Sequence, residues 1–189
     1  MMDRSLQDPL LILKPLFAGS ELPALGPASR VSRMPLAELN RQLDDALKRA
    51  NLPATAQALV RSAALLWHDH LDESHTLSQS IESPDGSFLH GIMHRREPDY
   101  ANAKYWFRRV GTHPCFSEIG RLGGGLLDSI GQGNLKRLLL PNDRWDPFAF
   151  VDSVERAASN RSLADCDLSL RQLQQVEFEV LFEHFCRLH

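Results

Sequence analysis

Histidines are concentrated in one part of this chain, where six of the eight lie within residues 68–113. Imidazole side chains bind metal ions and exchange protons near neutral pH. Ionisable groups that pack together are costly unless they are paired, metal-bound or functional. We therefore expect a functional site in this part of the chain.

The spacing within this segment suits metal coordination, because residues three or four apart share one face of a helix. His90 and His94 are four residues apart. Asp72 and His75 are three apart, as are His94 and Glu97. Imidazole and carboxylate ligands without a thiolate suit iron, manganese or zinc. The expected metal ligands are His75, His90, His94 and Glu97, and the expected catalytic residues are Asp72, His75 and Glu97.

Other polar residues are expected to orient these ligands, since a ligating histidine commonly uses its second ring nitrogen in a hydrogen bond. At 100° per residue, a continuous helix would place His68 and Gln79 on the same arc as His75. The expected supporting residues are His68, Gln79 and His113.

A basic and aromatic segment follows. Residues 95–109 hold five Lys and Arg, whereas residues 62–87 hold five acids and neither Lys nor Arg. Ion pairing between helices explains this segregation, and binding of an anion is the alternative, because Arg grips carboxylate or phosphate bidentately. The residues expected to hold such a ligand are Asn102, Lys104, Tyr105, Trp106 and Arg109.

Three functional interpretations are open. The first is a metal-assisted hydrolase or oxygenase that uses iron, manganese or zinc and acts on a small polar or anionic molecule. The second is a non-catalytic protein that binds an anionic metabolite or an acidic partner. The third is a structural seam in which histidines, aspartates and arginines hydrogen-bond one another.

Composition excludes several classes. The 189 residues are 43% hydrophobic and 24% charged, as expected for one globular domain. A net charge of −3 gives no general attraction for nucleic acid. The apolar run at residues 9–17 is too short for a membrane span and lacks the basic lead of a signal peptide, so we expect a cytoplasmic protein. The three cysteines form no CxxC pair, which argues against a disulfide framework.

Hydrophobic periodicity predicts an all-α fold, a bundle-like array of helices with an extended N-terminal arm. We expect the arm at residues 1–35 to pack on a single helical domain at residues 36–189. Helices are predicted at residues 35–50, 53–81, 87–97, 99–110, 146–159 and 167–188, with the glycine-rich residues 120–133 partly in a loop. The predicted site lies between the second, third and fourth of these helices.

A resemblance is carried by residues 90–114, which read HGIMHRREPDYANAKYWFRRVGTHP. This run resembles the HxxxHRRExDxxNxKYWxRRxGxHP signature of an uncharacterised family of soluble bacterial and fungal helical proteins. Residues 71–75, LDESH, and residues 145–148, WDPF, are similar to other parts of that pattern. The resemblance implies a site at this location and no particular reaction, since no activity is assigned to the family.

Overall fold

The computed structural model describes residues 8–19, 21–159 and 164–188. All regular structure in these ranges is helical, which confirms the predicted all-α class. The elements are α1 (Pro9–Leu13), η2 (Lys14–Phe17), α2 (Leu36–Ala50), α3 (Ala54–Trp67), α4 (Leu71–Ser78), α5 (Pro84–Arg96), α6 (Tyr100–Val110), α7 (Cys115–Ser129), α8 (Gly133–Leu139), η3 (Pro141–Asp143), α9 (Pro147–Ser159) and α10 (Ala164–Cys186). Within the described part of the chain, no helix is both long and apolar enough to cross a membrane.

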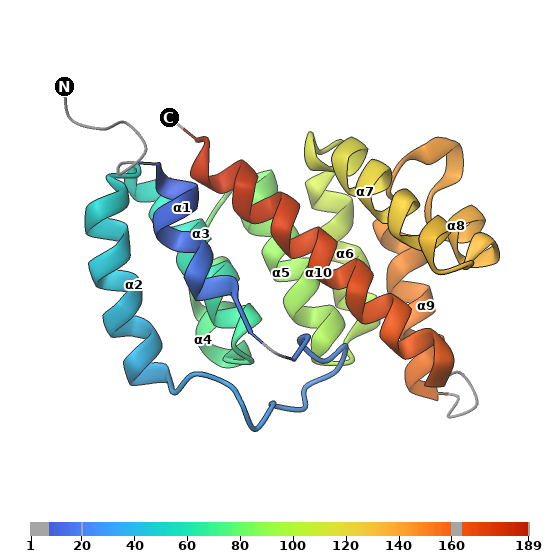
Figure 1. The fold of residues 1–189 in the computed structure, drawn as a ribbon, viewed down its shortest axis with the longest axis horizontal. Helices are drawn as coiled ribbons and strands as arrows, with labels where there is room; N and C mark the ends of the chain where they lie inside the picture. The colour runs from blue at the N-terminus through green and yellow to red at the C-terminus, as the bar shows by residue number, and fades with distance from the viewer. Residues whose placement is uncertain (1–7, 20, 160–163, 189) are drawn as a thin grey trace.

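The long helix α10 passes in front of α5 and α6 and contacts α9 near its start and α1 near its end (Figure 1). It packs against α3, α7 and α9, while α5 packs against α3, α4 and α6. The core between these helices is rich in aromatic rings. Fully buried phenylalanines are Phe88, Phe107, Phe150, Phe178 and Phe185. Each such side chain stabilises the fold by roughly 1.5–3 kcal/mol relative to an exposed one.

Helix starts follow local capping chemistry. Asp99 and Asp146 accept backbone N–H groups at the starts of α6 and α9, as predicted. The predicted start at Ser87 is wrong, because α5 begins earlier, at Pro84. Ser83 caps it by accepting the N–H three residues on, at 3.1 Å. Ser-Pro at a chain reversal is both a turn signal and a cap with proline at the first helical position.

The single helix predicted at residues 53–81 is also wrong, since α3 ends and α4 begins after a three-residue break. Asp69 in this break has a positive φ of 62°. Its buried carboxylate accepts the Arg30 Nε–H at 2.8 Å and an Arg96 Nη2–H at 2.7 Å. Long-range ion pairs therefore stabilise a positive φ, which a right-handed helix does not contain, and so end α3 at this point.

The described part of the N-terminal arm forms the short helices α1 and η2 and continues as irregular chain towards α2 (Figure 1). Leu13 is fully buried, whereas Leu11 of the same short helix is 58% exposed, so only part of the apolar run covers the core. Further along, the Gln174 amide of α10 donates to the carbonyl oxygens of Pro23 and Ala24 at 3.3 and 3.2 Å. These bonds satisfy arm carbonyls that no helix pairs.

Most of the glycine-rich stretch that was predicted to be partly in a loop is helical, since α7 continues to Ser129 and the loop is confined to residues 130–132. Close packing explains the glycines. A Cβ atom on Gly120 would lie 2.4 Å from the carbonyl oxygen of Asp143, and one on Gly123 would lie 3.0 Å from Leu173 Cδ2. Absence of a side chain thus lets η3 and α10 approach α7, and this outweighs the low helix propensity of glycine.

Candidate metal centre

Three histidines converge between α4 and α5. One ring nitrogen from each of His75, His90 and His94 lies within 4.8 Å of the other two. The rings of His90 and His94 stack at 4.8 Å, and His75 meets them edge-on at 4.8 and 5.1 Å. Ligand nitrogens around one ion, with bonds of about 2.1 Å, lie within about 4.2 Å of one another. Small side-chain rotations therefore bring all three imidazoles to a single ion.

Burial keeps two of these imidazoles neutral. His90 is 2% exposed and His94 is 5% exposed, while His75 is half-buried. Burial lowers the pKa of His90 to about 3, with the neighbouring His94 and His75 charges acting in the same direction. Burial, and then the His75 charge, also lowers the pKa of His94. Neutral imidazole is the form that coordinates metal ions.

Two nitrogens of the cluster lack hydrogen bonds. Within the described part of the chain, the Nδ1 atoms of His90 and His94 are buried without a hydrogen-bond partner. The other nitrogen of His94, Nε2, lies 3.1 Å from the Asn102 amide, which orients the ring. A buried polar atom without a partner costs about 1–3 kcal/mol. A cation bound at both Nδ1 atoms needs the His94 hydrogen on Nε2, where the side-chain oxygen of Asn102 accepts it once the amide is turned over; in that arrangement the residues present fit a metal ion.

Glu97 lies beside this cluster at the end of α5. Its Oε2 is 3.3 Å from His94 Nδ1, and its side chain is 29% exposed. Burial raises the pKa of Glu97, the His75 charge opposes this effect, and the Asp72 charge adds to it. A raised pKa makes this carboxylate a stronger proton acceptor than an ordinary glutamate.

A polar groove of about 620 Å³ includes Glu97 in its wall. Other parts of the wall come from the arm and the start of α4. Acidic side chains prevail there, since Asp72 and Glu73 stand beside Glu97 and Arg33 is the basic member. Of the predicted site residues, Asp72 and Glu97 line the groove, whereas none of the three histidines of the cluster is among its described lining residues.

Helix α6 supplies a wall on the other side. Trp106 stacks on His90, with ring centroids 3.9 Å apart and planes inclined by 14°. The Arg109 guanidinium lies 5.2 Å from the Trp106 ring centre, a cation–π contact. Tyr105 is 46% exposed and meets Trp106 edge-on. Among the predicted ligand-binding residues, Asn102 and Trp106 thus contact the histidines directly.

Three of the basic residues in segment 95–109 form ion pairs with acidic residues outside this segment. Lys104 pairs with Asp152 on α9, so its charge is already matched. Arg95 pairs with Glu177 on α10, and Arg96 pairs with the aspartate of the α3–α4 break. The predicted pairing between helices therefore exists, but two of its acidic partners lie on α9 and α10, outside residues 62–87.

The three predicted supporting residues lie elsewhere. His68 is turned towards the arm by the break after α3, and its Nε2 is 2.8 Å from the Leu16 carbonyl oxygen. Gln79 is exposed at the end of α4. His113 is buried at the start of α7, where its Nε2 is 3.0 Å from Asp85. The predicted orientation of His68 and Gln79 depended on one unbroken helix. No spacing argument supported the prediction for His113.

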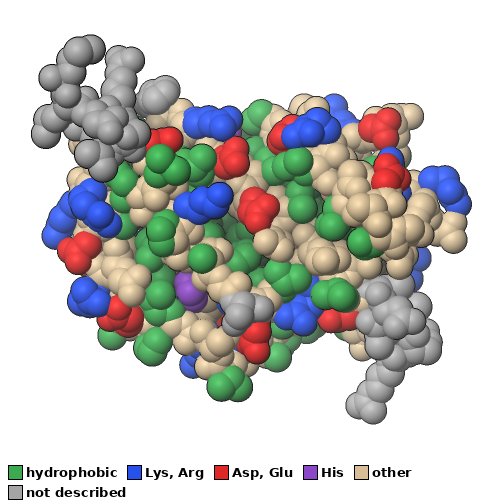
Figure 2. Space-filling model, viewed as in Figure 1, with side chains coloured by type: hydrophobic (Ala, Val, Ile, Leu, Met, Phe, Trp, Pro, Cys, Tyr) green, Lys and Arg blue, Asp and Glu red, His purple; other side chains and the backbone are tan. Residues whose placement is uncertain are grey.

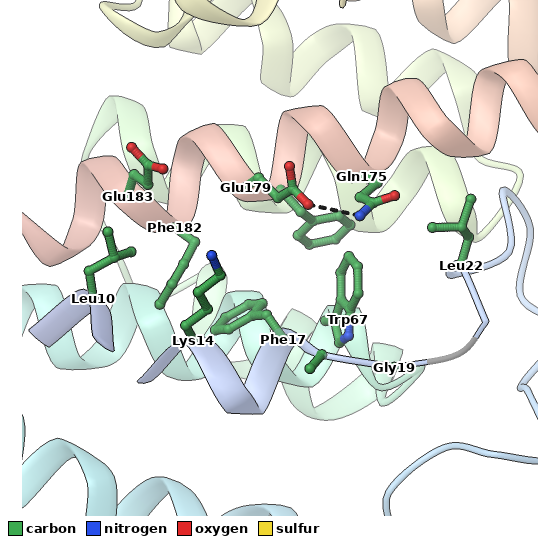
Figure 3. Close-up of a pocket in the computed structure, with 12 residues that line it drawn as sticks. Leu10, Lys14, Phe17, Gly19, Leu22, Trp67, Gln175, Glu179, Phe182 and Glu183 are labelled. Atoms are coloured by element: carbon green, nitrogen blue, oxygen red, sulfur yellow. Dashed lines mark hydrogen bonds between the residues drawn. The ribbon is translucent and has the colours of Figure 1, made fainter. Parts of the chain in front are cut away.

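A second cavity, of about 380 Å³, lies between the arm and α10 (Figure 3). Phe17 and Phe182 pack with ring centres 4.3 Å apart on its wall, next to Trp67. Lys14 and Glu179 border it. No histidine is among its described lining residues. The surrounding face mixes acidic, basic and apolar side chains (Figure 2). This apolar cavity is separate from the polar chemistry of the histidine cluster.

Acid should destabilise the metal-free protein. Folded His90 stays neutral down to a pKa of about 3, whereas in the unfolded chain its pKa is the ordinary histidine value of 6.5. Between these values the unfolded state binds more protons, so the free energy of unfolding falls as the pH falls, by up to about 1.4 kcal/mol per pH unit for this residue. Urea unfolding of chelator-treated protein across this window measures the slope. His90→Gln should flatten it, and an equal slope in that variant would contradict the assignment.

Comparison with known proteins identifies no family for this chain. No family model, no curated protein and no solved structure matches it.

Proposed function

We propose that this chain is a metal-dependent hydrolase in which His75, His90 and His94 bind a zinc, manganese or iron ion. One observation carries the proposal: three imidazoles from two helices converge, and in the described part of the chain the buried Nδ1 of His90 has no hydrogen-bond partner, while that of His94 lies 3.3 Å from Glu97 Oε2 without forming a hydrogen bond. Buried polar atoms are usually paired, so a bound ion is a suitable partner for the His90 nitrogen.

Hydrolysis is favoured over oxygen chemistry by the ligand types. Three histidines with an open position form a common catalytic zinc site, whereas non-haem iron oxygenases use two histidines and one carboxylate. Here the third converging side chain is an imidazole, and Glu97 lies beside His94. When bound, such an ion would lower the pKa of water at the site to about 7.

The chain's own residues then have distinct tasks. Glu97 accepts a proton from water at the cluster, since its pKa is raised and its carboxylate faces both His94 and the groove. Asn102 holds the His94 ring in one orientation. Trp106 covers the face of His90 and excludes water from it.

The substrate we infer is a small polar molecule that enters by the groove. Acidic side chains in the groove wall disfavour a strongly anionic molecule and favour a neutral or cationic one. This proposal differs from the anionic ligand expected from the basic segment, because Lys104 is paired with Asp152.

Metal content tests the proposal. Untagged protein purified without chelator should contain iron, manganese or zinc by elemental mass spectrometry. His94→Ala should lose one equivalent of this metal while keeping its helix content by circular dichroism. His68→Ala is the matched control, since it also removes a buried imidazole but should keep the metal. Full retention of metal by His94→Ala, or wild-type protein that resists reconstitution, would refute the assignment.

A second measurement addresses the reaction. Hydrolysis of para-nitrophenyl acetate by the metal-loaded protein should stop when a chelator removes the ion. Glu97→Gln should keep the metal and lose about a hundredfold or more of the rate, the usual contribution of a general base. Oxygen uptake with no ester hydrolysis would replace the hydrolase by an oxygenase.

A further inference from the structure

A second group of ligating side chains shares no residue with the first and lies where α5, α7 and α10 meet. Ligand atoms of His113, Cys115 and His184 lie within 4.8 Å of one another. Cys115 is the first residue of α7, and His184 is in the last turn of α10. Asp85 joins them from the first turn of α5.

Asp85 is the centre of this group. Its Oδ1 lies 3.0 Å from His113 Nε2 and 2.9 Å from His184 Nε2. His113 Nδ1 accepts the backbone N–H of Cys115 at 3.2 Å, so its Nε2 carries the hydrogen and donates to Asp85. His113 therefore fixes the carboxylate. Of the converging ligand atoms, those of Cys115 and His184 remain able to coordinate an ion, and the Asp85 carboxylate, 2.9 Å from His184 Nε2, is the third donor beside them.

Cys115 is unsuited to nucleophilic attack. It is a free cysteine with 4% exposure. Burial, and then the negative charge of Asp85, raises the pKa of Cys115 to about 12. A protonated, inaccessible thiol is inert, whereas a divalent cation bound beside it displaces the thiol proton.

We propose that Cys115, His184 and Asp85 form a second metal site, of the zinc type, that links α5, α7 and α10, with His113 as a positioning residue for the carboxylate. Sulfur, imidazole and carboxylate together are zinc ligands, and a thiolate selects against magnesium and manganese. On binding, the Cys115 thiol releases one proton to solvent, and the hydrogen on His184 Nε2 moves to Nδ1.

The surroundings supply an entry path. Asp85 lines a groove of about 590 Å³ between the start of α3 and the segment before α5. The His184 side chain is 25% exposed and the Asp85 side chain is 17% exposed, so ions in the solvent reach both of these ligands.

Cobalt binding tests this site independently of the first one. Cobalt bound by a thiolate shows a sulfur-to-metal charge-transfer absorption in the near ultraviolet, which a site of histidines alone does not give. The chain has three cysteines. We would therefore use the Cys166→Ser/Cys186→Ser full-length protein, in which Cys115 is the sole thiol, and titrate it with cobalt chloride.

We expect the charge-transfer absorption to saturate at one cobalt per chain in this protein. Adding Cys115→Ser should abolish the absorption, and adding His184→Ala should reduce it by half or more. His94→Ala should leave it unchanged, which separates this site from the proposed catalytic one. A cobalt spectrum without this absorption would overturn the proposal.

If the Cys166→Ser/Cys186→Ser protein does not fold, zinc content is measured in variants that keep Cys166 and Cys186. His94→Ala should still retain one equivalent of zinc, and His94→Ala/Cys115→Ser should retain none. Equal zinc in these two variants would overturn the second site and leave the test of the first site unaffected.

Discussion

Replacing Asp69 by Ala should lower the free energy of unfolding by about 3–5 kcal/mol, the usual cost of breaking a buried ion pair. The Asp69 side chain has no exposed surface and accepts hydrogen bonds from Arg30 and Arg96 at 2.8 and 2.7 Å. Arg96 is itself fully buried, so it would be left as a charge without its counter-ion. The same substitution removes the anchor of the positive φ between α3 and α4.

Urea denaturation followed by circular dichroism measures this loss. Asp44→Ala is the matched control, because Asp44 also pairs with an arginine, Arg61, but its side chain is 57% exposed. Exposed pairs contribute up to about 1 kcal/mol. Similar small losses in the two variants would show that the Asp69 network contributes little to stability.

Glu177→Ala should have a comparable effect, about 3–5 kcal/mol, for the same reason. Arg95 and Glu177 are both fully buried and form a two-pronged ion pair at 2.5 and 3.1 Å. Gln174 accepts a further hydrogen bond from Arg95 at 3.2 Å, and Phe150 lies under the guanidinium at 4.4 Å. Removing the carboxylate would leave this guanidinium in an apolar cavity.

A double variant distinguishes the loss of the Arg95–Glu177 ion pair from the loss of side-chain packing. Arg95→Met combined with Glu177→Leu replaces both charges by apolar groups of similar volume, which is often neutral for stability. We expect the double variant to recover most of the stability lost by Glu177→Ala in urea denaturation. A double variant less stable than Glu177→Ala would show that the charges themselves are required.

These two networks also hold the candidate site in place. Consecutive arginines at the end of α5 reach different partners, because Arg95 contacts α10 and Arg96 contacts the α3–α4 break. The same helix carries His90 and His94. Anchoring α5 on two sides thus fixes two of the three imidazoles relative to His75 on α4.

Much of the helical framework was predictable, because its signals are local. Asp99 and Asp146 cap the helices that follow them, and the predicted extents of α2, α6 and α9 agree with the structure within a residue or two. Capping needs only residues within one turn of each other. The break at Asp69 was missed because its cause, Arg30, lies 39 residues away.

The candidate site also has a part that local spacing predicts and a part that depends on contacts far apart in the chain. That His90 and His94 share a face was predictable, since the helical period places residues four apart side by side. That His68 belongs elsewhere was not, because the arm carbonyl that it contacts lies 52 residues away. Nothing in the spacing of Cys115 and His184 indicates that α7 and α10 bring them together.

The sequence by itself determined the helical class, both ends of α2, α6 and α9 to within a residue or two, and which polar residues share one helix face. Only the tertiary structure decided which faces meet: His75 with His90 and His94, and Cys115 with His184. Neighbours on one helix are set by its 3.6-residue turn, whatever surrounds it. Neighbours between helices are set by how apolar side chains far apart in the chain pack together, and that packing also decides which arginines, aspartates and histidines are buried side by side.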